Sequence, residues 1–474
     1  WLSCVAPSGL PAEVASQVKE RRRDMTSRLA VLLLAAALAA CAEEEVPAAV
    51  HVHTTWSGGA LTIREVAERA RKLGLRAVVL SDGYERAARW GPPPLQGLVH
   101  WTRERPSVRR SDLAAWIAEI DAASRAVPEV ALVPGLELAP VCAWSGAPWA
   151  GGLRAEGLHV HILAIGTAPV EAYESLPSRT DGPLHWDRGC TARFALARAA
   201  AIAALLLLRG RTRWASTAAL VVALAWFPLR RGIELDQGSP ADAVLGAAQR
   251  HGLTTSWAHP EALFPAHEAD VEGVRVRTAP YPERILLSPA TAFPSLYGDA
   301  HTSAGAGREW DRANLDYCEG RRAAPLWGIG EADFDGSLVA LDTYETVFLV
   351  DSPGVRGVER ALARGACYAA HAPGGRRVSL SFSVSDEATG AATGMGGTLR
   401  ASGPVRLRVE ARGDAGEATI TLIVDGRVRK EHSGPLPLLL DLAIDVPRGR
   451  SFVRALALRQ GGGAAVGNPV FVER

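Results

Sequence analysis

The stretch Ala49-Val50-His51-Val52-His53 ends an apolar run with two imidazoles two residues apart. Because residues i and i+2 of a strand face the same side, both rings can reach one ion. Three more metal-ligating side chains lie in, or at the end of, short apolar segments of strand character, namely Glu137, His161 and His259. Parallel strands of an α/β barrel deliver side chains to one shared rim in this way. Imidazole and carboxylate groups at one rim suit a hydrolytic metal centre, so the sequence predicts a metal-dependent hydrolase.

Each histidine alone also has a structural interpretation, because a single imidazole is easily satisfied in a protein core. The chain contains 12 His. Several lack the apolar context and are set aside: His100, His185, His251, His267, His371 and His432. The histidines that do lie in or after apolar segments follow one another along the chain at the ends of successive predicted strands, which favours the metal interpretation.

The composition bounds the possibilities. With 474 residues the chain is long enough for two or three domains. Its net charge is +1, which gives no electrostatic argument for a nucleic-acid partner.

The N-terminal region predicts export. Met25-Thr26-Ser27-Arg28 supplies a positive start, Leu29 to Leu38 an apolar core, and Leu38-Ala39-Ala40-Cys41 a small-residue cleavage site. This segment resembles the lipobox of bacterial lipoproteins, in which Cys41 would be lipidated and would anchor the chain to the cell envelope, facing the periplasm. The alternative is an ordinary secretory signal with Cys41 incidental. We expect residues 1–24 to be an upstream misassigned start, 25–41 a signal peptide and 42–49 a tether.

From residue 50 to about 350 a strand, turn, helix pattern repeats. Thr62 to Glu65 is a capping box that opens a helix, and Leu75 to Leu80 follows as a buried strand. Pro240 begins another helix, and the strand Leu253 to Trp257 then leads to His259. Such alternation predicts an α/β fold with parallel strands and right-handed crossovers, over residues 50–375.

Residues 194–229 interrupt this pattern with two apolar segments, Phe194 to Leu208 and Trp214 to Leu229, separated by an arginine-rich turn. Each is shorter than the roughly 20 residues that span a bilayer. Two interpretations stay open: two barrel helices, or a membrane-associated helical hairpin that would be a second membrane signal beside Cys41.

Beyond residue 376 the pattern changes to short alternating strands, with Asp425-Gly426 as a hairpin turn. Residues 376–474 are therefore expected to form a β-sandwich domain without a catalytic constellation, favoured as a packing appendage. Four cysteines follow the signal segment and allow three disulfide pairings: Cys142, Cys190, Cys318 and Cys367.

Taken together, the motifs resemble the PHP superfamily of metallohydrolases, the polymerase and histidinol phosphatase family. The matching segments are His51 to Ser57, Val78 to Asp82, Pro134 to Glu137, His161 with Leu-Ala-Ile-Gly, Trp257 to Pro260, and Glu331 to Asp335. The resemblance covers residues 50 to about 370. It implies a distorted (β/α)7 barrel that binds metals at its C-terminal rim.

The resemblance implies two complete metal sites. His51, His53, Glu137 and Asp333 would hold one divalent ion. Glu137, His161 and His259 would hold the second, with Glu137 bridging. Zn, Mn or Fe would suit these ligands alike.

The family's third site is depleted, because Gly58, Gly83 and Asp335 stand where the family usually has Asp, His and His. Asp82 is then expected to orient ligands or water. Asp299-Ala300-His301 is a rival to Asp333 for the last ligand motif. If His301 is the ligand, the third site is less depleted.

Two functions stay in play. The first is a hydrolase of small phosphate esters or related esters that uses water activated between two ions about 3.5–4 Å apart. For it, Asp335 is a candidate acid for the leaving group, and His371 a weaker one. The second is an envelope protein of the same fold that binds metal or a ligand without turnover.

Overall fold

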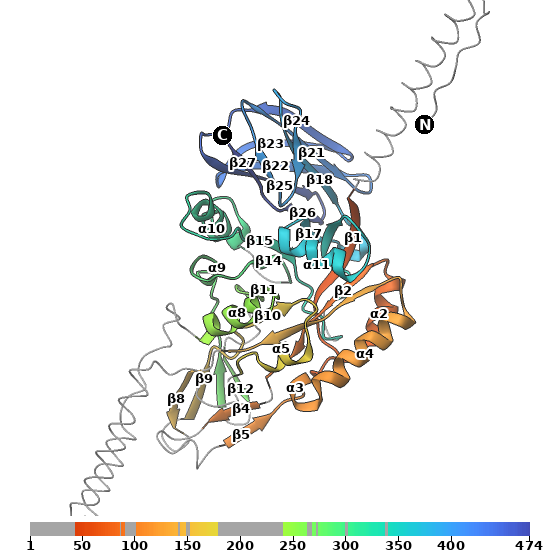
Figure 1. The fold of residues 1–474 in the computed structure, drawn as a ribbon, viewed down its shortest axis with the longest axis vertical. Helices are drawn as coiled ribbons and strands as arrows, with labels where there is room; N and C mark the ends of the chain where they lie inside the picture. Colours follow the sequence, from red (N-terminus) through yellow and green to blue (C-terminus); the bar gives the residue numbers. More distant parts are fainter. Residues whose placement is uncertain are drawn as a thin grey trace, which may run out of the picture. The chain divides into compact units, whose positions relative to one another are not determined.

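In the computed structural model, the described residues are 43–85, 87–90, 101–140, 143–147, 152–178, 240–262, 268–271, 274–298, 302–336 and 340–474 (Figure 1). The chain divides into the compact units Trp1–Glu44 and Glu45–Arg474, and all the described residues except 43 and 44 belong to the second. Several expectations fall outside the described residues: the segments 1–24 and 25–41 with Cys41, the apolar stretch 194–229, and the rival motif at 299–301. Among the described residues, no helix is long and apolar enough to cross a membrane.

The fold is mixed α/β, and its first sheet starts earlier than expected. Strand β1 (Glu44–Val52) pairs in parallel with β2 (Ala77–Leu80), which pairs in parallel with β6 (Ala131–Val133). Residues 44–49, expected within a tether, are the first part of β1, and Val46 to Val52 are buried. Apolar side chains of this segment, such as Val46 and Ala48, explain the difference, because they fill a core rather than link two bodies.

A second sheet has the order β15-β14-β11-β10-β7-β3. Its members are β3 (Asp82–Gly83), β7 (Gly135–Leu138), β10 (Ile162–Ile165), β11 (Thr254–Trp257), β14 (Ala292–Leu296) and β15 (Trp327–Gly330). Only Ser81 separates β2 from β3, and only Pro134 separates β6 from β7, so the chain passes twice from the first sheet to the second. At the other side a parallel bridge joins Val52, at the end of β1, to Phe334, just after β15.

Strand β10 departs from the expected parallel order. It is antiparallel to β7, with Leu163 opposite Glu137, and antiparallel to β11, with Leu163 opposite Ser256. The N-terminal end of β10 therefore lies beside the C-terminal ends of its neighbours. The expectation of parallel strands throughout is wrong here, although the reversal places His161, which precedes β10, at the rim where the other strands end.

Helices and small hairpins surround these sheets. The helices are α2 (Ile63–Lys72), α3 (Val108–Ser111), α4 (Leu113–Ala126), α5 (Val170–Glu174), α8 (Pro240–Arg250), α9 (Arg284–Leu287), α10 (Glu309–Cys318) and α11 (Val355–Arg364), with 3-10 turns η1 (Thr302–Ala304) and η2 (Pro373–Gly375). A further sheet has the order β12-β13-β9-β8, and β4 (Ala87–Trp90) pairs with β5 (Trp101–Glu104). The members of that sheet are β8 (Ala143–Ala147), β9 (Gly152–Glu156), β12 (Glu268–Val271) and β13 (Val274–Arg277).

Two helix boundaries follow general rules of helix capping. The capping box is present at α2, where Thr62 accepts from the Glu65 backbone N–H at 3.2 Å and Glu65 accepts from the Thr62 N–H at 2.8 Å. Helix α11 ends at Gly365, which adopts φ +71°. A Cβ there would lie 2.3 Å from the Trp327 ring, so both the backbone and the packing require glycine.

The C-terminal residues form two packed layers. One layer has the order β19-β18-β21-β24, from β18 (Ser379–Asp386), β19 (Ala392–Gly394), β21 (Val405–Arg412) and β24 (Leu438–Ile444). The other contains β20 (Thr398–Arg400), β22 (Glu417–Val424), β23 (Arg427–Pro435), β25 (Arg450–Arg459), β26 (Ala464–Gly467) and β27 (Val470–Glu473). Apolar side chains of both layers share one buried cluster, including Phe382, Leu407, Leu422 and Val453.

This C-terminal part is continuous with the first sheet rather than appended to it. Strand β26 pairs with β17 (Cys367–His371), which pairs with β16 (Tyr344–Val350), and β16 lies next to β1. Phe452 and Phe471 share a buried cluster with Val50 and Trp327. Cys367 is buried and Cys318 is half-buried, and neither forms a disulfide. The other two cysteines lie outside the described residues.

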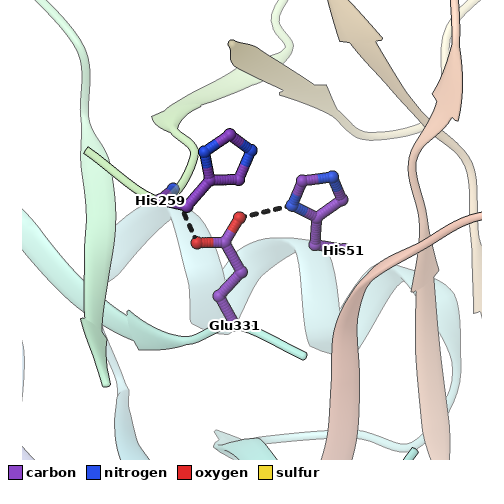
Figure 2. A group of neighbouring side chains, drawn as sticks. All are labelled: His51, His259 and Glu331. Atoms are coloured by element: carbon purple, nitrogen blue, oxygen red, sulfur yellow. Dashed lines mark hydrogen bonds and ion pairs between the residues drawn. The ribbon is translucent and has the colours of Figure 1, made fainter. Parts of the chain in front are cut away.

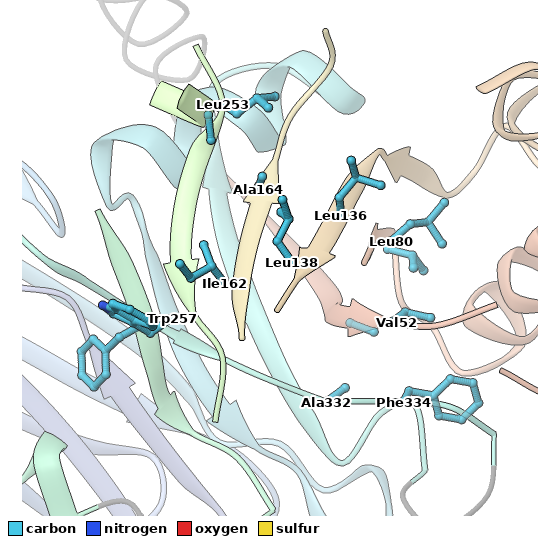
Figure 3. Close-up of a cluster of buried hydrophobic side chains, with 14 of the residues drawn as sticks. Val52, Leu80, Leu136, Leu138, Ile162, Ala164, Leu253, Trp257, Ala332 and Phe334 are labelled. Atoms are coloured by element: carbon cyan, nitrogen blue, oxygen red, sulfur yellow. The ribbon is translucent and has the colours of Figure 1, made fainter. Parts of the chain in front are cut away.

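A third apolar cluster lies among the strands that carry the predicted ligands. Figure 3 shows side chains of this cluster from β1, β7, β10 and β11, including Val52, Leu136, Ile162 and Trp257. Each of these strands carries a buried apolar residue within two positions of a predicted ligand. The packing therefore fixes the strand ends from which the polar side chains project.

Candidate metal centre

The predicted ligands come from separate strand ends. His51 lies on β1 and His53 just after it, Glu137 on β7, His161 immediately before β10, His259 two residues after β11, and Asp333 three residues after β15. Among the described residues, three groups have donor atoms within 4.8 Å of one another: His51 with His53 and Asp333, Glu137 with His161 and His259, and His51 with His259 and Glu331. The structure thus brings all six predicted ligands together.

Glu137 is the common neighbour of the four histidines. Its Oε1 lies 3.2 Å from His51 Nε2 and 3.7 Å from His259 Nε2, and it also pairs with His161 Nδ1. Its Oε2 lies 3.6 Å from His53 Nε2. One carboxylate can therefore face two groups of imidazoles, which is the arrangement of a bridging ligand.

The donor set fits divalent cations. His51 Nε2 and His53 Nε2 lie 3.2 Å apart, as do His161 Nδ1 and His259 Nε2. Asp333 Oδ1 lies 3.5 Å from His51 Nε2 and 3.8 Å from His53 Nε2. Nitrogen lone pairs this close repel one another unless a proton or a cation lies between them, and mixed imidazole and carboxylate donors suit Zn, Mn or Fe.

The backbone at three of these residues is strained. Among the described residues, the non-glycine residues with positive φ are His51 at 69°, His259 at 32°, Asp333 at 44°, and the hairpin residue Asp425 at 47°. Such conformations cost of order 1–3 kcal/mol each and persist where the surrounding structure fixes them, as at functional sites. Three of the predicted ligands therefore adopt a backbone that suits a site rather than a simple core.

Burial and charge act in opposite directions on the titrating groups. Burial disfavours the charged form of His51, but Asp333, Glu331 and Glu137 raise the pKa of His51 well above its ordinary value. Burial would raise the pKa of Glu137, but His161, His259 and His51 hold it well below its ordinary value. The metal-free centre thus keeps negative carboxylates among imidazoles that compete for protons, and a cation can replace those protons.

Glu331 is a member of this cluster that the sequence analysis did not assign. Its carboxylate is fully buried, and it bonds His51 Nδ1 through Oε1 and accepts from the His259 backbone N–H through Oε2 at 2.8 Å. Figure 2 shows it between the two histidines. By holding Nδ1, it leaves His51 Nε2 facing Glu137. Its position two residues before Asp333 was the one sequence signal for a role at the site. Its partner His51 lies 280 positions away in the chain, and such a distant pairing leaves no local sequence pattern.

Asp82 lies outside the three donor groups and supports the loop after His53. It is fully buried and accepts four hydrogen bonds: from the Thr54 N–H at 2.7 Å, the Thr54 hydroxyl at 2.8 Å, the Ser57 hydroxyl at 2.6 Å and the Trp116 indole at 3.0 Å. Ser57 Oγ in turn lies 3.2 Å from His53 Nδ1. Asp82 therefore orients His53 through Ser57.

Asp335 and His371, the candidate leaving-group acids, are not brought into the cluster. Asp335 is exposed, and its backbone carbonyl accepts from the Ala60 N–H at 2.8 Å. His371 stacks on Tyr344 with ring centroids 4.7 Å apart. Gly83 follows Asp82 on β3 and supplies no donor atom, as expected for a depleted third site.

His159 is a second residue that the sequence analysis passed over. It forms another His-x-His pair with His161, and the two ring centroids lie 5.7 Å apart. Burial, followed by the charges of His161 and Arg105, lowers the pKa of His159 to about 3. The His-x-His spacing was the only sequence signal for His159. It was not taken as a metal-binding motif because His159 follows no apolar strand.

Comparisons with known proteins give only distant likenesses. No family model matches the sequence, and no curated protein matches it. The chain is similar to a two-domain protein containing a predicted PHP-like metal-dependent phosphoesterase from Bacteroides vulgatus, at 11% identity over 87% of this chain and 90% of that chain, with a TM-score of 0.34. It is also similar to a putative metal-dependent phosphoesterase from Bifidobacterium adolescentis, at 15% identity over 67% and 96%, with a TM-score of 0.29.

A third similar structure is an amidohydrolase from Chromobacterium violaceum with bound sulfate and no metal, at 17% identity over 61% of this chain and 87% of that chain, with a TM-score of 0.27. The chemistry of the site follows from its own residues.

Proposed function

We propose that this chain is a PHP-superfamily metallohydrolase that cleaves small phosphate esters or related esters at a pair of divalent ions. One observation carries the proposal: Glu137 lies within 3.7 Å of imidazole nitrogens from both groups of predicted ligands. The ligands come from strands far apart in the sequence, and three of them adopt strained backbone. A core of satisfied histidines would have no need of either property.

The proposal includes a distorted (β/α)7 barrel. The strand path runs from β1 through β2 and β3, β6 and β7, β10, β11, β14 and β15. The bridge between Val52 and Phe334 returns it to β1. This closed path, with β10 reversed, would account for one rim that collects all the ligands.

The ligands divide into two groups, one for each ion. His51, His53 and Asp333 would hold one ion, His161 and His259 the other, and Glu137 both. Paired divalent ions lower the pKa of a water between them and neutralise charge that develops on an ester oxygen. Glu331 keeps His51 Nε2 directed at Glu137, and Asp82 keeps His53 in place through Ser57. The reaction would therefore depend on these two buried carboxylates as well as on the ligands.

The test is turnover by purified chain of known metal content. We expect metal-dependent hydrolysis of p-nitrophenyl phosphate, bis-p-nitrophenyl phosphate or an aryl ester, and loss of at least about a hundredfold in His161→Ala. The matched control is His432→Ala, on the C-terminal strand β23, which should retain wild-type rates. Hydrolysis at equal rates by wild type and His161→Ala would contradict the proposal.

A second candidate is a protein of the same fold that binds metal in the envelope without turnover. The exposed Asp335 and the glycines at 58 and 83 favour it, because they leave no assigned acid and a depleted third site. Metal-loaded chain that is inert on all three substrates, with His161→Ala losing only metal and stability, would decide for this candidate.

We also propose that the chain is exported and anchored by lipid on Cys41, facing the periplasm, with 194–229 as a second membrane contact. The lipobox-like sequence supports this proposal. Expressed in a bacterial host, wild type should sediment with membranes, and Cys41→Ser should move to the soluble fraction. If Cys41→Ser also sediments and only deletion of 194–229 releases it, the hairpin rather than the lipid is the anchor.

A further inference from the structure

The C-terminal strands reach toward the metal centre through one buried arginine. Arg454 lies on β25 and is wholly buried. Its guanidinium lies 4.5 Å from the centroid of the Trp310 ring, and it donates from Nε and Nη2 to the two oxygens of Asp311 at 2.7 and 3.0 Å. Such a two-point pair fixes direction as well as distance, so it ties β25 firmly to α10.

The same guanidinium holds the turn η1. Nη2 of Arg454 donates to the carbonyl of Ala304 at 2.9 Å and to that of Gly305 at 3.3 Å. Ala304 is the last residue of η1 (Thr302–Ala304). The position of η1 is thus set from the C-terminal sheet.

On its other side, η1 holds Glu261. This carboxylate is 6% exposed and accepts four hydrogen bonds from η1. The donors are the Thr302 N–H at 3.1 Å, the Thr302 hydroxyl at 2.5 Å, the Ser303 N–H at 3.0 Å and the Ser303 hydroxyl at 2.6 Å. A buried carboxylate satisfied in this way has one fixed position.

Glu261 lies two residues after the predicted ligand His259. Its own N–H donates to the Tyr297 hydroxyl at 2.9 Å, and the next N–H, from Ala262, donates to the His259 carbonyl at 3.0 Å. His259 has φ +32°, a conformation that neighbouring contacts must maintain. Glu331 fixes the N–H side of His259, and the Glu261 turn fixes the carbonyl side.

We infer that Arg454 and Glu261 are positioning residues for the metal centre, which makes the C-terminal β-strands a working part of that centre. The route runs from Arg454 to η1, from η1 to Glu261, and from Glu261 to His259. The inference rests on the proposed metal site, but it needs no turnover.

The experiment measures Co²⁺ binding to the metal-free full-length chain. Co²⁺ affinity comes from chelator competition, and the visible absorption of bound Co²⁺ reports its ligand geometry. The first variant is Arg454→Met with Asp311→Asn, which removes both buried charges together and so avoids an unpaired carboxylate. The second is Glu261→Gln, whose single amide oxygen replaces the two acceptors. The control is Arg450→Met on the same strand, whose guanidinium pairs with Glu473 at 2.7 Å.

Both test variants should bind Co²⁺ on the order of tenfold more weakly, with an altered spectrum, while Arg450→Met matches wild type. If the double variant does not fold, Glu261→Gln alone decides. Wild-type affinity and spectrum in Glu261→Gln would overturn the inference and leave the proposed function intact. A wild-type chain that binds no Co²⁺ would instead overturn the proposed function.

Discussion

Glu331 offers the sharpest test at the scale of a single residue. Its two oxygens serve two donors, the His51 ring and the His259 backbone N–H. Glu331→Gln has one acceptor oxygen, so it must turn an NH₂ group toward one of them and disturb the His51 tautomer. We expect metal affinity to fall by about 10–100-fold, measured by chelator competition. Glu431→Gln, an exposed carboxylate on β23, is the matched control. Unchanged affinity in Glu331→Gln would show that His51 needs no such support.

Protons at His51 should make metal binding depend on pH. Burial opposes its charge, but Asp333, Glu331 and Glu137 raise its pKa well above the ordinary value, so the metal-free ring holds its proton to a higher pH than a free imidazole does. A cation at Nε2 displaces that proton, and the metal-bound state therefore has fewer protons. Raising the pH favours the state with fewer protons.

Metal affinity should consequently rise from about pH 6 to about pH 8, with at least about one proton released per chain. Calorimetry in buffers of different ionisation enthalpy measures that release. Binding of equal strength across this range, with no proton released, would contradict the account.

At the scale of elements, the loop after β1 depends on Asp82. The carboxylate accepts from Thr54, Ser57 and Trp116, and Asp82→Asn replaces one acceptor oxygen with a donor. We expect a loss of about 2 kcal/mol in unfolding free energy and weaker metal binding, because Ser57 no longer holds His53. Urea denaturation and metal titration measure the two effects. A loss of stability without a change in metal binding would show that Asp82 does not position His53 for the metal.

The cap of α2 provides the comparison. Thr62→Ala removes the side-chain acceptor for the Glu65 N–H and should cost about 1 kcal/mol of unfolding free energy. Because α2 carries none of the ligands, metal affinity should stay at the wild-type value. A parallel fall in metal affinity would mean that any destabilisation weakens the centre, and that the Asp82→Asn result is not specific.

Local patterns predicted the elements better than their pairing. The capping box at Thr62 and the helix starting at Pro240 are present as predicted, since each depends on neighbouring residues. The reversal of β10 was not predicted, because a short apolar strand has the same pattern in either direction. His161 was still placed at the correct rim. Glu331 was missed because its partners come from distant strands. His159 was missed because it follows no apolar run.

At the scale of the whole molecule, the C-terminal strands are expected to be needed for folding. Strand β26 pairs with β17, and Phe452 and Phe471 pack in the cluster that contains Val50. A chain ending at residue 375 would expose this surface and the edge of β17. We expect it to be insoluble or rapidly cleaved by protease, as limited proteolysis would show. A stable, metal-binding fragment would restore the view of residues 376–474 as a separate appendage.

In the proposed centre, Glu137 lies between two cations held by the histidines and Asp333. Anomalous diffraction from crystals of metal-loaded protein, recorded at the metal absorption edge, tests it directly. The account predicts two peaks at roughly 2.0–2.2 Å from Glu137 oxygens, one beside His51 and His53 and the other beside His161 and His259. A map with no peak within bonding distance of Glu137, from crystals shown to contain metal, would contradict it.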